Sequence, residues 1–221
     1  MKSIQDLIDE ALVPKPRVRS GKWSPSSFGY CFRAQFWNRK DEPKSNPPDA
    51  RSLRVFKVGQ LFHDFVQGLL PDVEQTEAEI ESEDVKGFAD IVRLNEVVDI
   101  KSQHSKSFWW MKKKDCDIKQ EKYGNWLQVL YYARELGKDF GRLVFISKDD
   151  LAIQEYVQPL DGYWREQLDL ELGKLRMLWG KDKLPDAQPR CTQTKKGTYW
   201  HCEYCSWKDK CFSLEKGEQN E

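Results

Sequence analysis

GFADIVRLNEVVDIKSQ, residues 87–103, holds the pattern that decides the fold, because its two apolar runs each carry charged side chains. Asp90 lies on the first run, and Asp99 and Lys101 lie on the second. Only residues 94–96 separate the two runs, which is typical of a β-hairpin. Because strand side chains alternate between faces, Asp99 and Lys101 share one face of the second strand.

The length of the hairpin loop decides where Asp90 points. A two-residue loop at 94–95 pairs Asp90 with Asp99, and a two-residue loop at 95–96 pairs it with Lys101. Both registers place the three charges on one face, whereas a three-residue loop turns Asp90 to the other face. We therefore expect a cluster of three charged side chains on this hairpin.

Two carboxylates about 5 Å apart repel each other by about 3 kcal/mol at an effective dielectric constant of about 20. A cation between them removes this cost. Lys101 could serve, but a divalent metal held by oxygen ligands serves better. The alternative is a surface hairpin with solvated charges, and the hairpin alone leaves both readings open.

The residues around the hairpin predict an α/β fold, a mixed central sheet flanked by helices. A helix is expected over 51–70, with a buried stripe of Val58, Phe62, Phe65 and Leu69. A short amphipathic helix and a linker fill residues 1–20, and Ser24 followed by Pro25 predicts the start of another helix. Strands are expected at 73–82, 87–94, 96–102, 142–147 and 151–157, with further helices at 120–136 and 161–179.

The composition is that of a folded protein without a large net charge. Among 221 residues, 39% are hydrophobic and 33% are charged, and 9 Trp, 8 Tyr and 11 Phe argue against disorder. Because the net charge is zero, nucleic-acid affinity must come from local asymmetry. Residues 101–122 carry an excess of lysine, whereas we expect the acidic run over 72–84 to be a solvated face.

No apolar run is long enough to span a bilayer, and no signal-peptide core is evident at the N-terminus. We therefore expect a cytoplasmic protein without membrane partners. Thiols stay reduced in that compartment, so the six cysteines favour metal ligation over disulfides.

Two helices bring further polar groups toward the hairpin. His63 follows Gly59 by four residues, and Gln128 and Tyr132 share one helix face. Each signal is weak alone. In order, however, G-x3-H, G-x2-D, D-x-K and Q-x3-Y resemble the RecB-like branch of the PD-(D/E)XK nuclease superfamily over residues 51–157. The resemblance implies a restriction-endonuclease-like core.

The resemblance also implies a role for each residue of the site. One or two Mg2+ or Mn2+ ions would be held by His63, Asp90, Asp99 and the carbonyl of Ile100. Lys101 would orient the attacking water or stabilise charge on the phosphate, and Gln128 and Tyr132 would contact the DNA strand. The second acid is Asp where many relatives have Glu, which leaves the number of metal ions open.

The C-terminal tail carries a second set of possible metal ligands, the C-x2-C-x5-C array Cys202, Cys205 and Cys211. Three thiolates need a fourth ligand for a zinc site or a cubane cluster, and Cys31, Cys191 or His201 could supply it. Unligated thiols are the third possibility. Cys116 is expected to be a bystander.

Cys31 in the stretch SPSSFGYC, together with the tail array, resembles the CRISPR-associated RecB-like exonucleases and their phage relatives. This resemblance implies a 4Fe-4S cluster that joins segments 24–40 and 190–212 of one nuclease domain, residues 21–221, around a core at 51–158. Cys191 stays open as an alternative to Cys31.

The stretch SFWWMKKK, residues 107–114, follows the strand that carries Lys101. Bases could stack on Trp109 and Trp110 while lysines follow the phosphates. The lysines are Lys112, Lys113 and Lys114. The alternative is a packed tryptophan pair beside a solvated lysine run.

The resemblance implies a metal-dependent DNA exonuclease that acts on single-stranded DNA or DNA ends. It also implies a setting in phage or prokaryotic recombination, repair or CRISPR adaptation, with proteins of those processes as partners. The alternatives are a catalytically idle DNA-binding module with a metal cluster and a structure-specific endonuclease.

Overall fold

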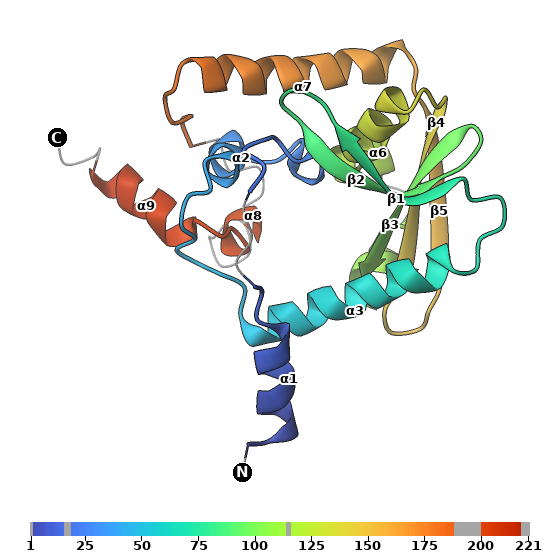
Figure 1. Ribbon diagram of the computed structural model, residues 1–221, viewed down its shortest axis with the longest axis horizontal. Helices are drawn as coiled ribbons and strands as arrows, with labels where there is room; N and C mark the ends of the chain where they lie inside the picture. The colour runs from blue at the N-terminus through green and yellow to red at the C-terminus, as the bar shows by residue number, and fades with distance from the viewer. Residues whose placement is uncertain (1, 16–18, 114–115, 188–199, 218–221) are drawn as a thin grey trace. The chain divides into compact units, whose positions relative to one another are not determined.

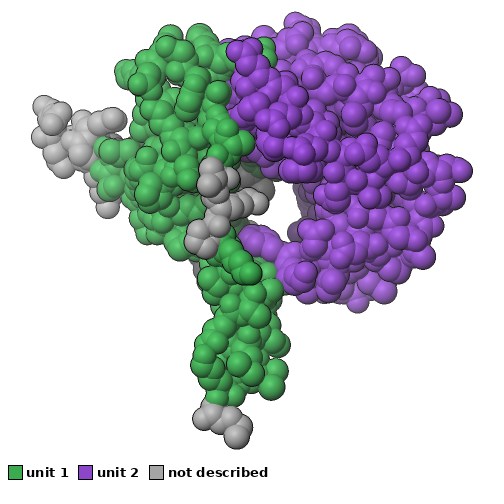
Figure 2. Space-filling model, in the orientation of Figure 1, with its two compact units in different colours: residues 1–21, 30–54, 175–221 green, residues 22–29, 55–174 purple. Residues whose placement is uncertain are grey.

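The computed structural model describes residues 2–15, 19–113, 116–187 and 200–217. The chain forms two compact units, coloured separately in Figure 2. Unit 1 comprises residues 1–21, 30–54 and 175–221, and unit 2 comprises residues 22–29 and 55–174. The predicted hairpin, His63, Gln128 and Tyr132 belong to unit 2, whereas Cys31 and the tail cysteines Cys202, Cys205 and Cys211 belong to unit 1.

Unit 2 is built on a five-stranded sheet with the strand order β1-β2-β3-β4-β5 (Figure 1). The strands are β1 Gln75–Glu81, β2 Lys86–Val92, β3 Glu96–Gln103, β4 Phe140–Ser147 and β5 Ile153–Pro159. Strands β3 and β4 run parallel, and the other neighbours run antiparallel. The prediction of a mixed α/β sheet is therefore confirmed.

Helices α3, Ala50–Gln67, and α6, Tyr123–Glu135, pack against this sheet. On one face of the sheet, Val66 of α3 joins a buried cluster with Ile91, Val98, Ile100, Val144 and Ile146. On the other face, α6 lies so close to β4 that a Cβ on Gly141 would meet Leu130 and Val129 at 2.9 Å. These two contacts fix the helices that flank the hairpin.

The predicted buried stripe of α3 is wrong for three of its four residues, whereas Phe62 is packed against the core. Val58, Phe65 and Leu69 are exposed, and the residues that face the sheet are Val66, with Phe62 and Leu70 packed beside it. The observed contacts keep the spacing of four residues from Phe62 to Val66 but rotate the buried face of the helix.

The helix expected from Ser24 is interrupted. Residues Pro25–Ser27 form a single 3-10 turn, and α2, Phe32–Arg39, begins only after Cys31. Gly29 adopts a left-handed backbone (φ 74°), and a Cβ there would lie 3.0 Å from the backbone of Gly124. The glycine therefore breaks the helix and allows this turn to approach the start of α6.

Unit 1 joins the segment around α2 to the C-terminal tail. The rings of Trp37 and Trp207 lie 6.1 Å apart, and the indole of Trp207 donates to the carbonyl of Glu42. The helices of this unit are α1, Ile4–Leu12, α2, α8, Trp200–Glu203, and α9, Lys208–Gly217.

The remaining helices are α4, Ser105–Trp110, α5, Ile118–Glu121, and α7, Gly162–Gly180. Within the described part of the chain, every helix is too short or too polar to cross a membrane.

Candidate active site

The hairpin adopts the first of the two expected registers. Ile91 pairs with Val98 and Val92 with Val97, and the N–H of Arg93 donates to the carbonyl of Glu96 at 2.9 Å. The loop is therefore the two residues 94–95, and the register extended by one pair places Asp90 opposite Asp99.

The regular pairing of β2 with β3 stops just before this pair of acids. Asp90 takes the place of a backbone acceptor, because its Oδ2 accepts the N–H of Ile100 at 2.7 Å. Its Oδ1 lies 3.4 Å from Nδ1 of His63 on α3. Asp90 is buried, so these contacts hold its carboxylate in one orientation.

Asp99 is still more buried, with an exposed fraction of 1%. Its carboxylate lies 2.8 Å from the ammonium of Lys101, which also donates to Oε1 of Gln128 at 3.3 Å. Burial raises the pKa of Asp99 to about 6; Lys101 opposes the shift and the charge of Asp90 adds to it.

His63 balances part of the negative charge. Burial lowers the pKa of His63, but the hydrogen bond and the charge of Asp90 outweigh burial, so the pKa lies above its ordinary value. A Cβ on Gly59, one turn earlier, would lie 3.3 Å from the hydroxyl of Ser102. The glycine therefore permits α3 to approach β3 closely.

Gln128 and Tyr132 both reach this site from α6 and are buried there, although most polar side chains on helices are exposed. Burial raises the pKa of Tyr132 well above its ordinary value, and the charge of Asp99 acts in the same direction. A Cβ on Gly87 would lie 2.5 Å from the Tyr132 hydroxyl, so only glycine leaves room for it. Tyr132 is therefore held as a neutral hydrogen-bond donor.

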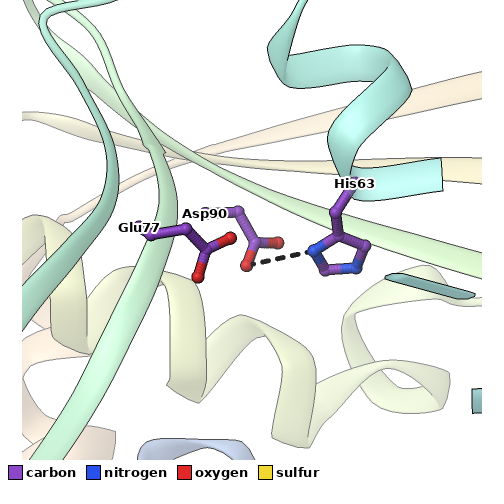
Figure 3. Close-up of side chains that lie close together, drawn as sticks. All are labelled: His63, Glu77 and Asp90. Atoms are coloured by element: carbon purple, nitrogen blue, oxygen red, sulfur yellow. Dashed lines mark ion pairs between the residues drawn. The ribbon is translucent and has the colours of Figure 1, made fainter. Parts of the chain in front are cut away.

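Sequence reasoning missed one acidic residue. Glu77 of β1 belongs to the run that we expected to be solvated, yet its carboxylate points toward Asp90 and His63 (Figure 3). One ligand atom of each of these three residues lies within 4.8 Å of the others. The pairing of β1 with β2 could have revealed this position, because their register leaves Glu77 opposite Asp90.

The residues expected to bind DNA lie on or just after α4. Trp109 and Trp110 are 44% and 41% exposed, so both side chains are partly packed and partly open to solvent. The indole of Trp109 donates to Asp150 at 3.0 Å, and the ammonium of Lys112 lies 4.4 Å from its ring centroid. Lys113 is exposed, and Lys114 lies outside the described residues.

The four cysteines of the expected cluster gather in unit 1. Burial raises the pKa of Cys205, and the charges of Cys31, Cys202 and Cys211 act in the same direction. No three of these sulfurs come within 4.8 Å of one another among the described residues. Cys191 lies outside the described residues.

No family model and no curated protein matches the sequence. Among solved structures, SSO0001 matches with a TM-score of 0.52 and 18% identity, over 95% of this chain and 92% of that chain. LHK-Exo, an alkaline exonuclease from Laribacter hongkongensis, has a TM-score of 0.44 and 12% identity, over 80% of this chain and 95% of that chain. A phage-related exonuclease from Haemophilus somnus 129PT matches with a TM-score of 0.44 and 12% identity, over 82% of this chain and 100% of that chain. The first likeness shows that this chain shares its fold with SSO0001.

The raised pKa of Asp99 predicts a pH dependence of stability in the presence of chelator. The folded state holds this proton up to about pH 6, whereas the unfolded state releases it near 3.8, so wild-type stability falls across that window as pH rises. The Asp99→Asn variant lacks this loss. Its free energy of unfolding should rise relative to the wild type between pH 4 and 7, by about 3 kcal/mol at most. Urea unfolding at several pH values measures the difference; a difference independent of pH would contradict the burial of an ionisable Asp99.

Proposed function

We propose that this protein is a metal-dependent deoxyribonuclease of the RecB-like type. One observation carries the proposal: Asp90 and Asp99 are buried side by side on one hairpin, and Lys101 is bonded to the deeper acid. A protein without need of a cation would gain stability by replacing one of the two acids with an apolar residue. The two acids therefore form a site of concentrated negative charge that suits a divalent cation.

The donor set fits a hard divalent cation. Mg2+ or Mn2+ would be held by His63, Asp90, Asp99 and the carbonyl of Ile100. Both ions prefer oxygen ligands, and Mn2+ also binds an imidazole nitrogen. When bound, the cation would polarise the phosphate and lower the pKa of a bound water.

The remaining groups of the site have separate tasks. Lys101, held between Asp99 and Gln128, would orient the attacking water and balance negative charge that develops on the phosphate. Tyr132, kept neutral by burial, would donate a hydrogen bond to the DNA strand. Gln128 would keep the ammonium of Lys101 in position.

The substrate that we propose is single-stranded DNA or a DNA end, cleaved as an exonuclease. Trp109 and Trp110, whose rings are partly exposed, follow Lys101 by eight and nine residues along the chain. Lys112 and Lys113 come directly after them. Exposed indoles beside lysines suit stacked, unpaired bases and their phosphates. An idle DNA-binding module would not need the buried acids.

We also propose that Cys31, Cys202, Cys205 and Cys211 hold a 4Fe-4S cluster. A single zinc ion would draw its sulfur ligands to about 3.8 Å from one another at a Zn–S bond of about 2.3 Å. The ligands of a 4Fe-4S cluster bind four separate irons and therefore lie farther apart.

A buried arginine supports this proposal. Arg33 donates from Nη1 to Sγ of Cys211 at 3.4 Å and from Nε to the carbonyl of Pro185 at 2.7 Å. Within the described residues it forms no ion pair with a carboxylate. A buried guanidinium without a counter-charge is costly, and thiolates bound to iron would supply the negative charge.

Asp99→Ala and Lys101→Ala should each lower Mn2+-dependent cleavage of end-labelled DNA by at least about 100-fold, because both groups act at the reacting phosphate. Folding and DNA affinity should change little. Lys138→Ala is the matched control, since Lys138 also pairs with an acid, Glu74, and bonds the hairpin loop at the carbonyl of Leu94. Cleavage by either site variant at the wild-type rate would refute the assignment.

Replacing Trp109 and Trp110 by Ala should weaken the binding of single-stranded DNA more than that of duplex DNA, because stacking contributes about 1–3 kcal/mol per base. Fluorescence anisotropy with chelator present measures both affinities. Tyr163→Ala, which removes another exposed ring of unit 2, should leave them unchanged. Equal losses for the two kinds of DNA would exclude stacking on unpaired bases.

Cys31→Ser should remove the brown colour, iron and sulfide from protein purified without oxygen, because three tail thiolates leave one iron without a protein ligand. Cys116→Ser, in unit 2, is the control and should keep the cluster. If Cys191→Ser is colourless and Cys31→Ser stays brown, the fourth ligand is Cys191. Colourless wild-type protein with stoichiometric zinc would contradict the cluster itself.

A further inference from the structure

We propose that Glu77 is a ligand of a divalent cation at the active site, together with His63 and Asp90. The inference rests on the proposed nuclease site and adds to it a third element, the edge strand β1. The cation expected is of the Mn2+ class, because the set combines two carboxylates with an imidazole nitrogen.

The geometry already suits one cation. The three side chains come from α3, β1 and β2 and lie side by side, with the Asp90 carboxylate between the other two groups in Figure 3. Their nearest ligand atoms lie within 4.8 Å of one another. Ligands on opposite sides of an octahedral ion with bonds of about 2.1 Å are about 4.2 Å apart, so small side-chain shifts would close the site.

The backbone of β1 is altered where Glu77 faces Asp90. Thr76 pairs with Ile91 and Ala78 pairs with Ala89, but the intervening pair does not form. Glu77 instead adopts a left-handed conformation with φ of 48°, which is unfavourable for a residue with a Cβ. The local change turns the Glu77 carboxylate toward the site.

A single amide holds Glu77 in this place. Nε2 of Gln67 donates to Oε1 of Glu77 at 2.7 Å and to the carbonyl of Asp90 at 3.0 Å. The two acids that would share the cation are therefore linked through the last residue of α3.

Glu77 also differs from the other acids of β1 in its ion pairs. Glu79 and Glu81 both form ion pairs with Lys86, and Glu81 pairs with Lys22 as well. Among the described residues, no lysine or arginine forms an ion pair with Glu77. Among the described residues, the ion pair observed for these two neighbouring carboxylates is that of Asp90 with His63.

The deeper acid, Asp99, meets the ammonium of Lys101 with both carboxylate oxygens. Its Oδ1 accepts a hydrogen bond from Lys101 at 2.8 Å, and its Oδ2 lies 2.8 Å from the same nitrogen. Asp99 does not belong to the group of three within 4.8 Å. Glu77 would therefore add a carboxylate from β1 to the ligands proposed on α3 and the hairpin.

Titration of metal-free protein with Mn2+, without DNA, tests this inference by calorimetry or by the electron paramagnetic resonance signal of free Mn2+. Glu77→Gln keeps the shape and the Gln67 contact but removes the charge, and it should weaken Mn2+ binding by at least 10-fold. Glu79→Gln, two residues along the same strand, should bind Mn2+ within twofold of the wild type. Gln67→Leu should bind several-fold more weakly, because Glu77 loses its anchor but keeps its charge.

Thermal melting in chelator shows whether each variant folds. Glu77→Gln should melt at or above the wild-type temperature, since the change relieves the repulsion of Asp90, and should lose most of the stabilisation by Mn2+. Wild-type Mn2+ affinity in Glu77→Gln would overturn the inference, whatever the cleavage assay gives. If the wild type binds Mn2+ through Glu77 but cleaves no DNA, the proposed nuclease function fails and the ligand assignment stands.

Discussion

The repulsion between Asp90 and Asp99 is the constraint on which the rest of unit 2 depends. A two-residue loop sets these acids opposite each other, and burial deprives both of water. Such a pair persists only where the surroundings supply positive charge or hydrogen-bond donors. The donors observed are the N–H of Ile100 for one acid and the ammonium of Lys101 for the other.

The helices that flank the hairpin are shaped by the same requirement. Helix α6 gives up apolar packing at two buried positions, Gln128 and Tyr132, so that polar groups face the acids. Helix α3 brings His63 to Asp90, which requires the close approach that Gly59 allows. The acids of this hairpin are buried, so they are not the solvated charges of a surface hairpin.

Much of this site follows from local sequence rules, and the failures have physical reasons. The hairpin was predictable because apolar runs of strand length flank a loop of fixed short length. The buried face of α3 was not, because apolar residues lie on several sides of that helix and Val66 is the one that meets the sheet. Glu77 was missed because the acidic run was read along the chain, whereas its neighbour Asp90 lies across the sheet.

We propose that Asp90 and Asp99 are kept side by side because together they bind a divalent cation. The most direct measurement is the anomalous diffraction of crystals grown with Mn2+, recorded above the manganese absorption edge. We expect an anomalous peak within bonding distance of the Asp90 carboxylate, between α3 and the hairpin. Occupied Mn2+ sites elsewhere on the protein, with no peak at Asp90, would contradict it.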